Sequence, residues 1–141
     1  MAQAADPVVE NLTPEECWAL LGENGIGRLA TAVVEAVTGR ISPDIFPVNY
    51  LVHERAVLFR SAPGSKLIDL TRQPAVAFQV DGRVRRDMWS VVVHGDAERM
   101  GFDSEIEESG IRELQASHPT DKWNYVRIGV REITGIRFRE N

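Results

Sequence analysis

Short apolar runs, rich in β-branched and aromatic residues, recur along the chain from residue 26 onward, and turn-forming residues separate them. Turn-like separators such as Thr38-Gly39-Arg40, His53-Glu54-Arg55 and Asp81-Gly82 favour antiparallel neighbours over helical crossovers. The chain is therefore predicted to be mainly β, with a mostly antiparallel sheet. The six predicted strands cover residues 26–34, 45–52, 56–61, 75–80, 89–99 and 125–138.

Three helices are predicted between or before these strands. Thr13 can cap the first, Pro14 suits its first position, and Glu16 completes a capping box, so this helix should run to about Gly22. Cys17 lies on its apolar side and is predicted to face the core. The second helix should cover residues 65–73, and the third should run from about 104 to a point before residue 119, packing on the sheet through apolar side chains. These are Ile106, Ile111 and Leu114.

Composition fits one soluble domain over residues 1–141, with 43% hydrophobic and 26% charged residues. The net charge of -5 argues against nucleic acid as a partner, since phosphate backbones require an excess of Lys and Arg. No run is long and apolar enough to cross a membrane. A single cysteine, Cys17, and an N-terminus without a secretory pattern lead us to expect a cytoplasmic protein.

The stretch from residue 59 to 67 has the pattern of an anion site, because a predicted strand, a turn and a helix start follow one another. Arg60 and Lys66 supply charges, Ser65 supplies a hydroxyl, and Gly64 lets the backbone approach a ligand. A phosphate would suit this set. The same pattern would also arise if Ser65 only capped its helix and both cations were solvated.

A second unusual stretch is the strand around Pro47. Proline cannot donate a hydrogen bond to a neighbouring strand, so this strand should lie at an edge or a bulge. Asn49 is an amide within an apolar run, and if buried it needs hydrogen-bond partners, which a ligand or neighbouring backbone could supply.

In four segments the sequence resembles the pyridoxamine 5'-phosphate oxidase-like family of flavin-binding split barrels. A closing strand over residues 133–138 is also similar, so the resemblance spans nearly the whole chain. The four segments are residues 16–18 with 27–30, residues 44–50, residues 60–67 and residues 89–95.

The resemblance implies a six-stranded antiparallel split β-barrel that forms a homodimer, with two FMN sites at the subunit interface. It implies phosphate contacts from Arg60, Ser61, Ser65 and Lys66. The flavin ring would lie along Pro47, Val48, Asn49 and Tyr50, largely on their backbone groups, and it would be approached by Trp89 and Ser90.

The predicted function is that of an FMN-binding oxidoreductase, of the flavin reductase or oxidase type, acting on a small-molecule redox substrate. No side chain stands out as a catalytic acid or base. One alternative is an F420-dependent reductase, whose anionic tail could meet Arg83, Arg85 and Arg86, although Asp81 and Asp87 flank these arginines.

The other alternative is a non-catalytic module for flavin or haem. Haem would need His53, His94 or His118 as an axial ligand. One cysteine and three scattered histidines do not make a zinc pattern. Compared with the family, the stretch 35–42 is a long first hairpin and the stretch 83–87 is unusually charged, so oxidation of vitamin B6 itself is not implied.

Overall fold

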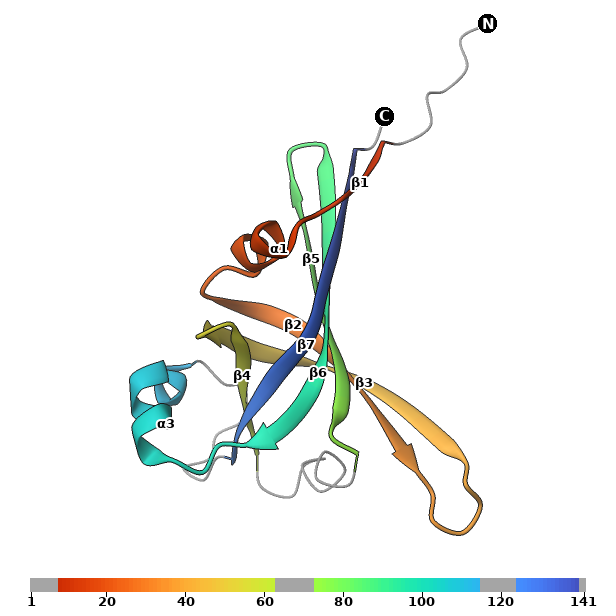
Figure 1. The fold of residues 1–141 in the computed structure, drawn as a ribbon, viewed down its shortest axis with the longest axis vertical. Coiled ribbons are helices and arrows are strands. Elements are labelled where there is room, and N and C mark those ends of the chain that lie inside the picture. Colours follow the sequence, from red (N-terminus) through yellow and green to blue (C-terminus); the bar gives the residue numbers. More distant parts are fainter. Residues whose placement is uncertain (1–7, 63–72, 115–123, 140–141) are drawn as a thin grey trace, which may run out of the picture.

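A computed structural model describes residues 8–62, 73–114 and 124–139. Two helices and a short 3-10 turn accompany the strands of this part of the chain (Figure 1). In chain order the elements are β1 (Val9–Asn11), α1 (Pro14–Leu21), β2 (Asn24–Val34), β3 (Ile41–His53), β4 (Ala56–Ser61), β5 (Ala75–Val84), β6 (Asp87–Arg99), α3 (Asp103–Ser109), η1 (Ile111–Glu113) and β7 (Asn124–Arg139).

All strand pairs are antiparallel, in the order β1-β7-β4-β3-β2-β5-β6. A further pairing between β7 and β6 closes the sheet on itself, so six strands form a ring and β1 extends β7 on the outside. This confirms the predicted mainly β, antiparallel class. All six predicted strands are present. The sequence missed β1, because three exposed residues carry little apolar signal.

The first helix matches its prediction closely. The Glu16 backbone N–H donates to Thr13 Oγ1 over 3.2 Å, and the Thr13 N–H donates to Glu16 Oε1 over 3.1 Å. Cys17 and Leu21 are buried against the core, as predicted for Cys17. The capping box therefore fixes where the chain turns from β1 into α1.

The third predicted helix is shorter than expected. It ends at Ser109 because Gly110 adopts a left-handed conformation with φ 77°, and the 3-10 turn η1 follows. Ile106 and Ile111 are buried as predicted, in a second core cluster with Leu58 and Met100. Residues 65–72 of the predicted second helix, and the part of the predicted third helix beyond residue 114, lie outside the described residues.

One turn was placed wrongly. Asp81-Gly82 lies inside β5, and the chain instead turns at Arg85 and Arg86, between the paired residues Val84 and Asp87. The glycine serves packing: a Cβ at position 82 would lie 2.7 Å from the Trp89 indole on β6. An Asp-Gly pair is a turn signal locally, but here the cross-strand partner explains the glycine.

The two faces of the ring differ sharply. On β2, Leu29 and Thr31 point inward and are buried, whereas Ile26 and Arg28 point outward and are exposed. The far end of the β2–β3 hairpin projects from the body (Figure 1), since β5 pairs with β2 only at residues 28–30.

Candidate functional site

Four of the predicted site residues lie on the outer face of the ring. Pro47 and Asn49 are two residues apart on β3 and so share a face. Asn49 directly precedes Tyr50 and Arg60 directly follows Phe59, the last register pair of β3 with β4. An antiparallel continuation of this register would place Arg60 opposite Asn49, on the same face. Ser90 on β6 is on the outer face as well, opposite Asp81.

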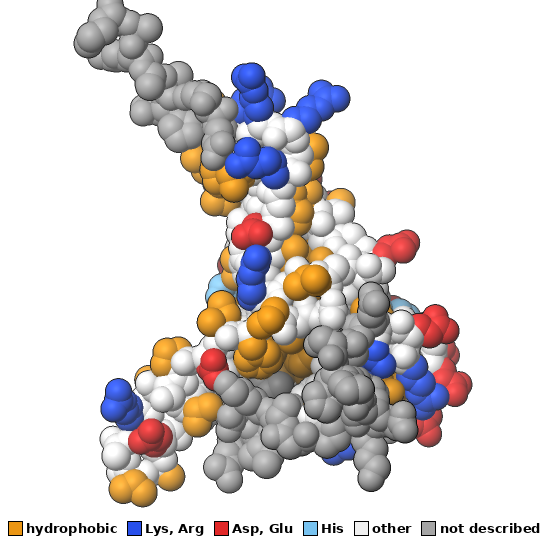
Figure 2. Space-filling model, turned by 180° about the vertical axis from the view of Figure 1, so that it is seen from behind, with side chains coloured by type: hydrophobic (Ala, Val, Ile, Leu, Met, Phe, Trp, Pro, Cys, Tyr) orange, Lys and Arg blue, Asp and Glu red, His pale blue; other side chains and the backbone are white. Residues whose placement is uncertain are grey.

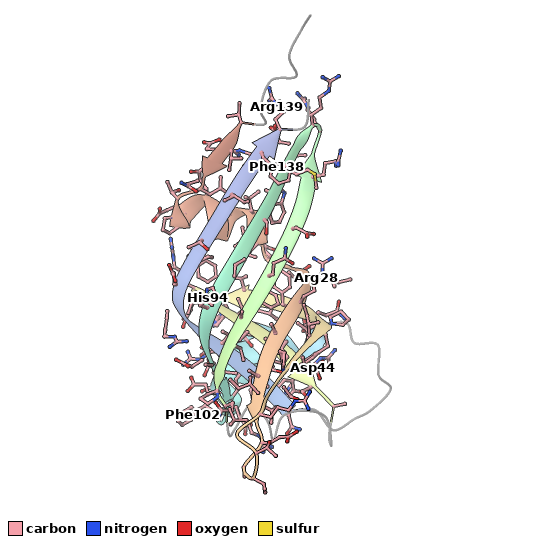
Figure 3. All side chains as sticks on the ribbon, turned by 90° about the vertical axis from the view of Figure 1, so that its right-hand side faces the viewer. Arg28, Asp44, His94, Phe102, Phe138 and Arg139 are labelled. Carbon is pink, nitrogen blue, oxygen red and sulfur yellow. The ribbon has the colours of Figure 1, made fainter. Side chains whose placement is uncertain are left out.

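The register joins these positions into one row across the outer face. Arg28 on β2 lies opposite Pro47 on one side and opposite Gln79 of β5 on the other. Asp81 is two residues beyond Gln79 and pairs with Ser90. We call this set the polar row, and it crosses five neighbouring strands, β4, β3, β2, β5 and β6. Its members are Arg60, Asn49, Pro47, Arg28, Gln79, Asp81 and Ser90. Figure 3 labels Arg28, the residue of the row on β2.

A hydrogen-bonded network holds the middle of the polar row. Arg28 Nη1 donates to Gln79 Oε1 and to Asp81 Oδ1, both over 3.1 Å. Gln79 Nε2 donates to Asp81 Oδ2 and to Ser90 Oγ, again over 3.1 Å. Hydrogen bonds from Gln79 and Arg28 lower the pKa of the Asp81 carboxyl. The network is a preorganised set of donors and acceptors on the outer face.

Sequence reasoning did not identify Arg28, Gln79 and Asp81 as site residues. Arg28 and Gln79 are separated by 51 positions, and only the strand register brings them together. The usable signal was local: each is a polar residue in an apolar strand, two positions from another outward-facing residue.

Exposed apolar side chains lie beside the polar row on the β2–β3 hairpin. Ile26, Ile45 and Ile41 are 67%, 65% and 63% exposed, and the register places all three on the outer face of the β2–β3 hairpin. Figure 2 shows hydrophobic side chains along the hairpin and onto the body of the molecule. Isolated exposed apolar residues are ordinary, but a continuous group on one face is typical of a binding surface.

The edge predicted at Pro47 is present. β3 pairs with β2 along its length, whereas β4 pairs with β3 only from Tyr50 onward within the described residues. Beside this edge lies a hollow of about 760 Å³. Asn49, Ile26 and Leu51 line it together with Glu23 and Glu113. The two acids disfavour an anion within the hollow itself, so a phosphate fits better on the Arg60 side.

Arg60 connects β4 to the helical segment that covers it. Its Nη1 donates to the backbone carbonyl of Arg112 over 3.2 Å, which holds the guanidinium at this end of the polar row. Ser61 is the last residue of β4 and pairs with Asn124 of β7. Ser65 and Lys66 lie outside the described residues, so their phosphate contacts stay predictions.

The side chains of the remaining predicted residues point inward. Tyr50 is 2% exposed, its hydroxyl donates to the Leu21 carbonyl over 2.6 Å, and burial raises its pKa. Val48 and Trp89 pack against the same core cluster. Their side chains are therefore turned away from the outer face, and a contact with a flavin there would involve their backbone groups. Their side chains stabilise the barrel.

The histidines are scattered, as the sequence suggested. His94 is exposed on the outer face of β6 (Figure 3), whereas His53 Nε2 lies 3.9 Å from Glu54 on the β3–β4 turn. His118 lies outside the described residues. Within the described ranges, no three His, Cys, Asp or Glu side chains come together as metal ligands. No helix in those ranges is long and apolar enough to span a membrane.

The closed antiparallel sheet with a covering helix defines a split β-barrel. The model of the family described as Pyridoxamine 5'-phosphate oxidase matches residues 13–137, and the chain belongs to this family. An uncharacterised protein of Mycobacterium tuberculosis is 37% identical over 89 residues, which are 63% of this chain and 81% of that protein.

Solved structures extend the likeness to nearly the whole chain. A Corynebacterium glutamicum protein named "Putative pyridoxamine 5'-phosphate oxidase" is 35% identical with a TM-score of 0.79, covering 94% of this chain and 100% of that one. An FAD binding protein of Mycobacterium smegmatis is 34% identical with a TM-score of 0.74, at the same coverage. A haem binding protein of M. smegmatis, 16% identical with a TM-score of 0.61 over 82% of this chain and 49% of that one, shares the fold.

Proposed function

We propose that the protein is a flavin-dependent oxidoreductase that binds FMN, or the FMN half of FAD, along the polar row. The observation that carries the proposal is the row itself. It aligns an arginine, an amide, a hydroxyl and an exposed apolar surface across five strands. The FAD binding relative at 34% identity supports a flavin as the ligand class.

The donors in the row suit the two ends of a flavin nucleotide. Arg60, with Ser61, Ser65 and Lys66 nearby in sequence, would hold the 5'-phosphate, because charge-assisted hydrogen bonds contribute about 1.5 to 3 kcal/mol each. The backbone of residues 47–50 and the Asn49 amide would meet the ring. The Arg28–Gln79–Asp81–Ser90 network would fix the polar groups around it.

We further propose that a second copy of the chain covers the outer face. Ile26, Ile41 and Ile45 are too exposed to stabilise a monomer, and burial of such side chains contributes about 1.5 to 3 kcal/mol each. Because the same face carries the polar row, a homodimer would enclose the flavin between subunits and exclude water.

A bound flavin would supply hydride or electron transfer to a small-molecule redox substrate. The chain would position the ring and the substrate, since the row contains no carboxylate or imidazole poised as an acid or base: Asp81 is held ionised by its hydrogen bonds to Gln79 and Arg28. The protein is thus expected to work through placement and desolvation.

A comparison of FMN with riboflavin tests the proposed phosphate contacts. We expect the double variant Arg60→Ala/Lys66→Ala to weaken FMN binding about 100-fold and riboflavin binding little, because riboflavin lacks the phosphate. Fluorescence quenching titrations measure both, and FAD titrated in parallel tells which nucleotide is preferred. Equal losses for FMN and riboflavin would contradict the phosphate assignment.

His94 favours one other candidate, a haem-binding module, because an exposed imidazole on the outer face could serve as an axial ligand. This reading predicts a Soret band on adding haem that is lost in His94→Ala, together with no quenching of FMN or FAD fluorescence. Deazaflavin F420 in the same titration tests the remaining alternative.

A further inference from the structure

The turn between β5 and β6 carries an unusual density of positive charge. Arg83 is the last outward-facing residue of β5, and Arg85 and Arg86 form the turn itself. All three are exposed. We call them the arginine turn. The whole chain has 16 basic and 21 acidic residues, so this patch opposes the protein's net charge. Figure 2 shows arginine side chains gathered at one end of the molecule, which is the end of this hairpin.

The acids that flank the arginine turn in sequence are engaged by other residues. Asp81 is bonded to Arg28 and Gln79, and Asp87 Oδ1 accepts from Arg139 Nε over 2.9 Å. The hydrogen bond from Arg139 lowers the pKa of the Asp87 carboxyl. Among the described residues, Arg85 and Arg86 have no ion pair of their own. The acids beside the turn are thus bonded to Arg28, Gln79 and Arg139 rather than to Arg85 or Arg86.

The arginine turn continues the polar row. Ser90 lies opposite Asp81, and the next outward pair along the same two strands is Met88 opposite Arg83. At about 3.3 Å per residue, Arg83 is roughly 7 Å beyond Asp81. A molecule lying on the row past Ser90 would thus reach the arginines next.

We propose that the arginine turn binds the polyanionic part of a small-molecule redox co-substrate whose reactive part lies on the flavin site. The inference rests on the proposed function and adds the class of its substrate. Guanidinium groups match both phosphate and carboxylate geometry, and two or three on one turn favour a ligand with several negative charges. Since the site is exposed, its affinity should fall with salt.

Anion titrations test this with the flavin-loaded full chain. Calorimetry at low ionic strength would measure binding of tripolyphosphate and of tricarballylate, which separate a phosphate from a carboxylate preference. We expect Arg85→Gln/Arg86→Gln to weaken binding of the preferred anion about 10-fold, because two exposed positive charges are lost and each contributes only modestly in water. The matched control is Arg55→Gln/Arg99→Gln, which removes two exposed arginines away from the turn and from the polar row and should leave the affinity unchanged.

The outcomes separate this proposal from the function on which it rests. Unaltered anion affinity in Arg85→Gln/Arg86→Gln, with flavin quenching intact, overturns the arginine turn alone. An equal loss in the control pair also overturns it, since net charge would then explain the effect. Loss of the dimer in the turn variant would assign the arginines to contacts between copies instead. Absent flavin quenching in the unmutated chain defeats the proposed function.

Discussion

At the scale of single residues, close cross-strand approaches determine which positions tolerate a side chain. Gly95 on β6 is buried beside the register shift between residues 94 and 95, and a Cβ there would collide with the backbone carbonyl oxygen of Gly129. Gly129 itself is exposed, and a Cβ on it would lie 3.9 Å from the Asp96 carbonyl, an ordinary contact. The two glycines therefore differ in the space available for a side chain, although they lie close together on paired strands.

We expect Gly95→Ala to lower the free energy of unfolding by about 1 to 3 kcal/mol, since backbone must shift to admit the methyl group. Gly129→Ala is the matched control and should change stability by less than about 1 kcal/mol, or raise it slightly through the unfolded chain. Urea unfolding measures both. Similar values for the two variants would contradict the close approach at Gly95.

Asp81 gives a pH-dependent prediction. Its hydrogen bonds to Gln79 and Arg28 lower its folded pKa below the ordinary value of 3.8, so its stabilisation is present above that value and is lost as the pH falls through the folded pKa. Because the side chain is half exposed, we expect Asp81→Asn to cost only about 0.5 kcal/mol at neutral pH.

The stability difference between the unmutated chain and Asp81→Asn should shrink once the pH drops below about 4. Chemical denaturation of both proteins at a series of pH values measures this difference. Glu108→Gln serves as the control, because Glu108 is exposed on α3 and has no ion pair with another described residue. A difference that grows toward acid pH would contradict the account of Asp81.

At the scale of elements, the local pattern predicted six of the strands because each is a run rich in β-branched and aromatic residues, which favour β-structure. The capping box at Thr13 likewise predicted the start of α1. The polar row could not be predicted in the same way, since Arg28 meets Gln79 and Asp81 only through the register of β2 with β5. The prediction of a turn at Asp81-Gly82 was wrong for the same reason. Gly82 is required by its close contact with Trp89 on the neighbouring strand, which the local sequence does not reveal.

The β2–β3 hairpin carries the prediction for assembly. We expect Ile45→Asp to separate a dimer into monomers, because it places a charge on the outer face that the second copy would cover. Light scattering with size exclusion measures this. Phe102→Asp is the control: Phe102 is 74% exposed but precedes α3, away from the polar row. A chain that is monomeric before mutation would contradict the proposed interface.

At the scale of the whole molecule, the ring of strands separates two tasks. Its inner face forms the core with α1, where Tyr50 and Trp89 contribute to stability. Beyond the part that α3 and η1 cover, its outer face carries the exposed isoleucines of the β2–β3 hairpin, with the polar row across it and the arginine turn at one end. Inner and outer residues alternate on the same strands, so the fold that builds the core also positions the candidate site.

The most direct test of this account is a fluorescence titration of FMN and FAD with the full chain. We predict quenching of at least one flavin that saturates at one flavin per chain, with loss of affinity when Arg28→Ala removes the centre of the polar row. Retained fluorescence with both flavins at high protein concentration would contradict the central claim.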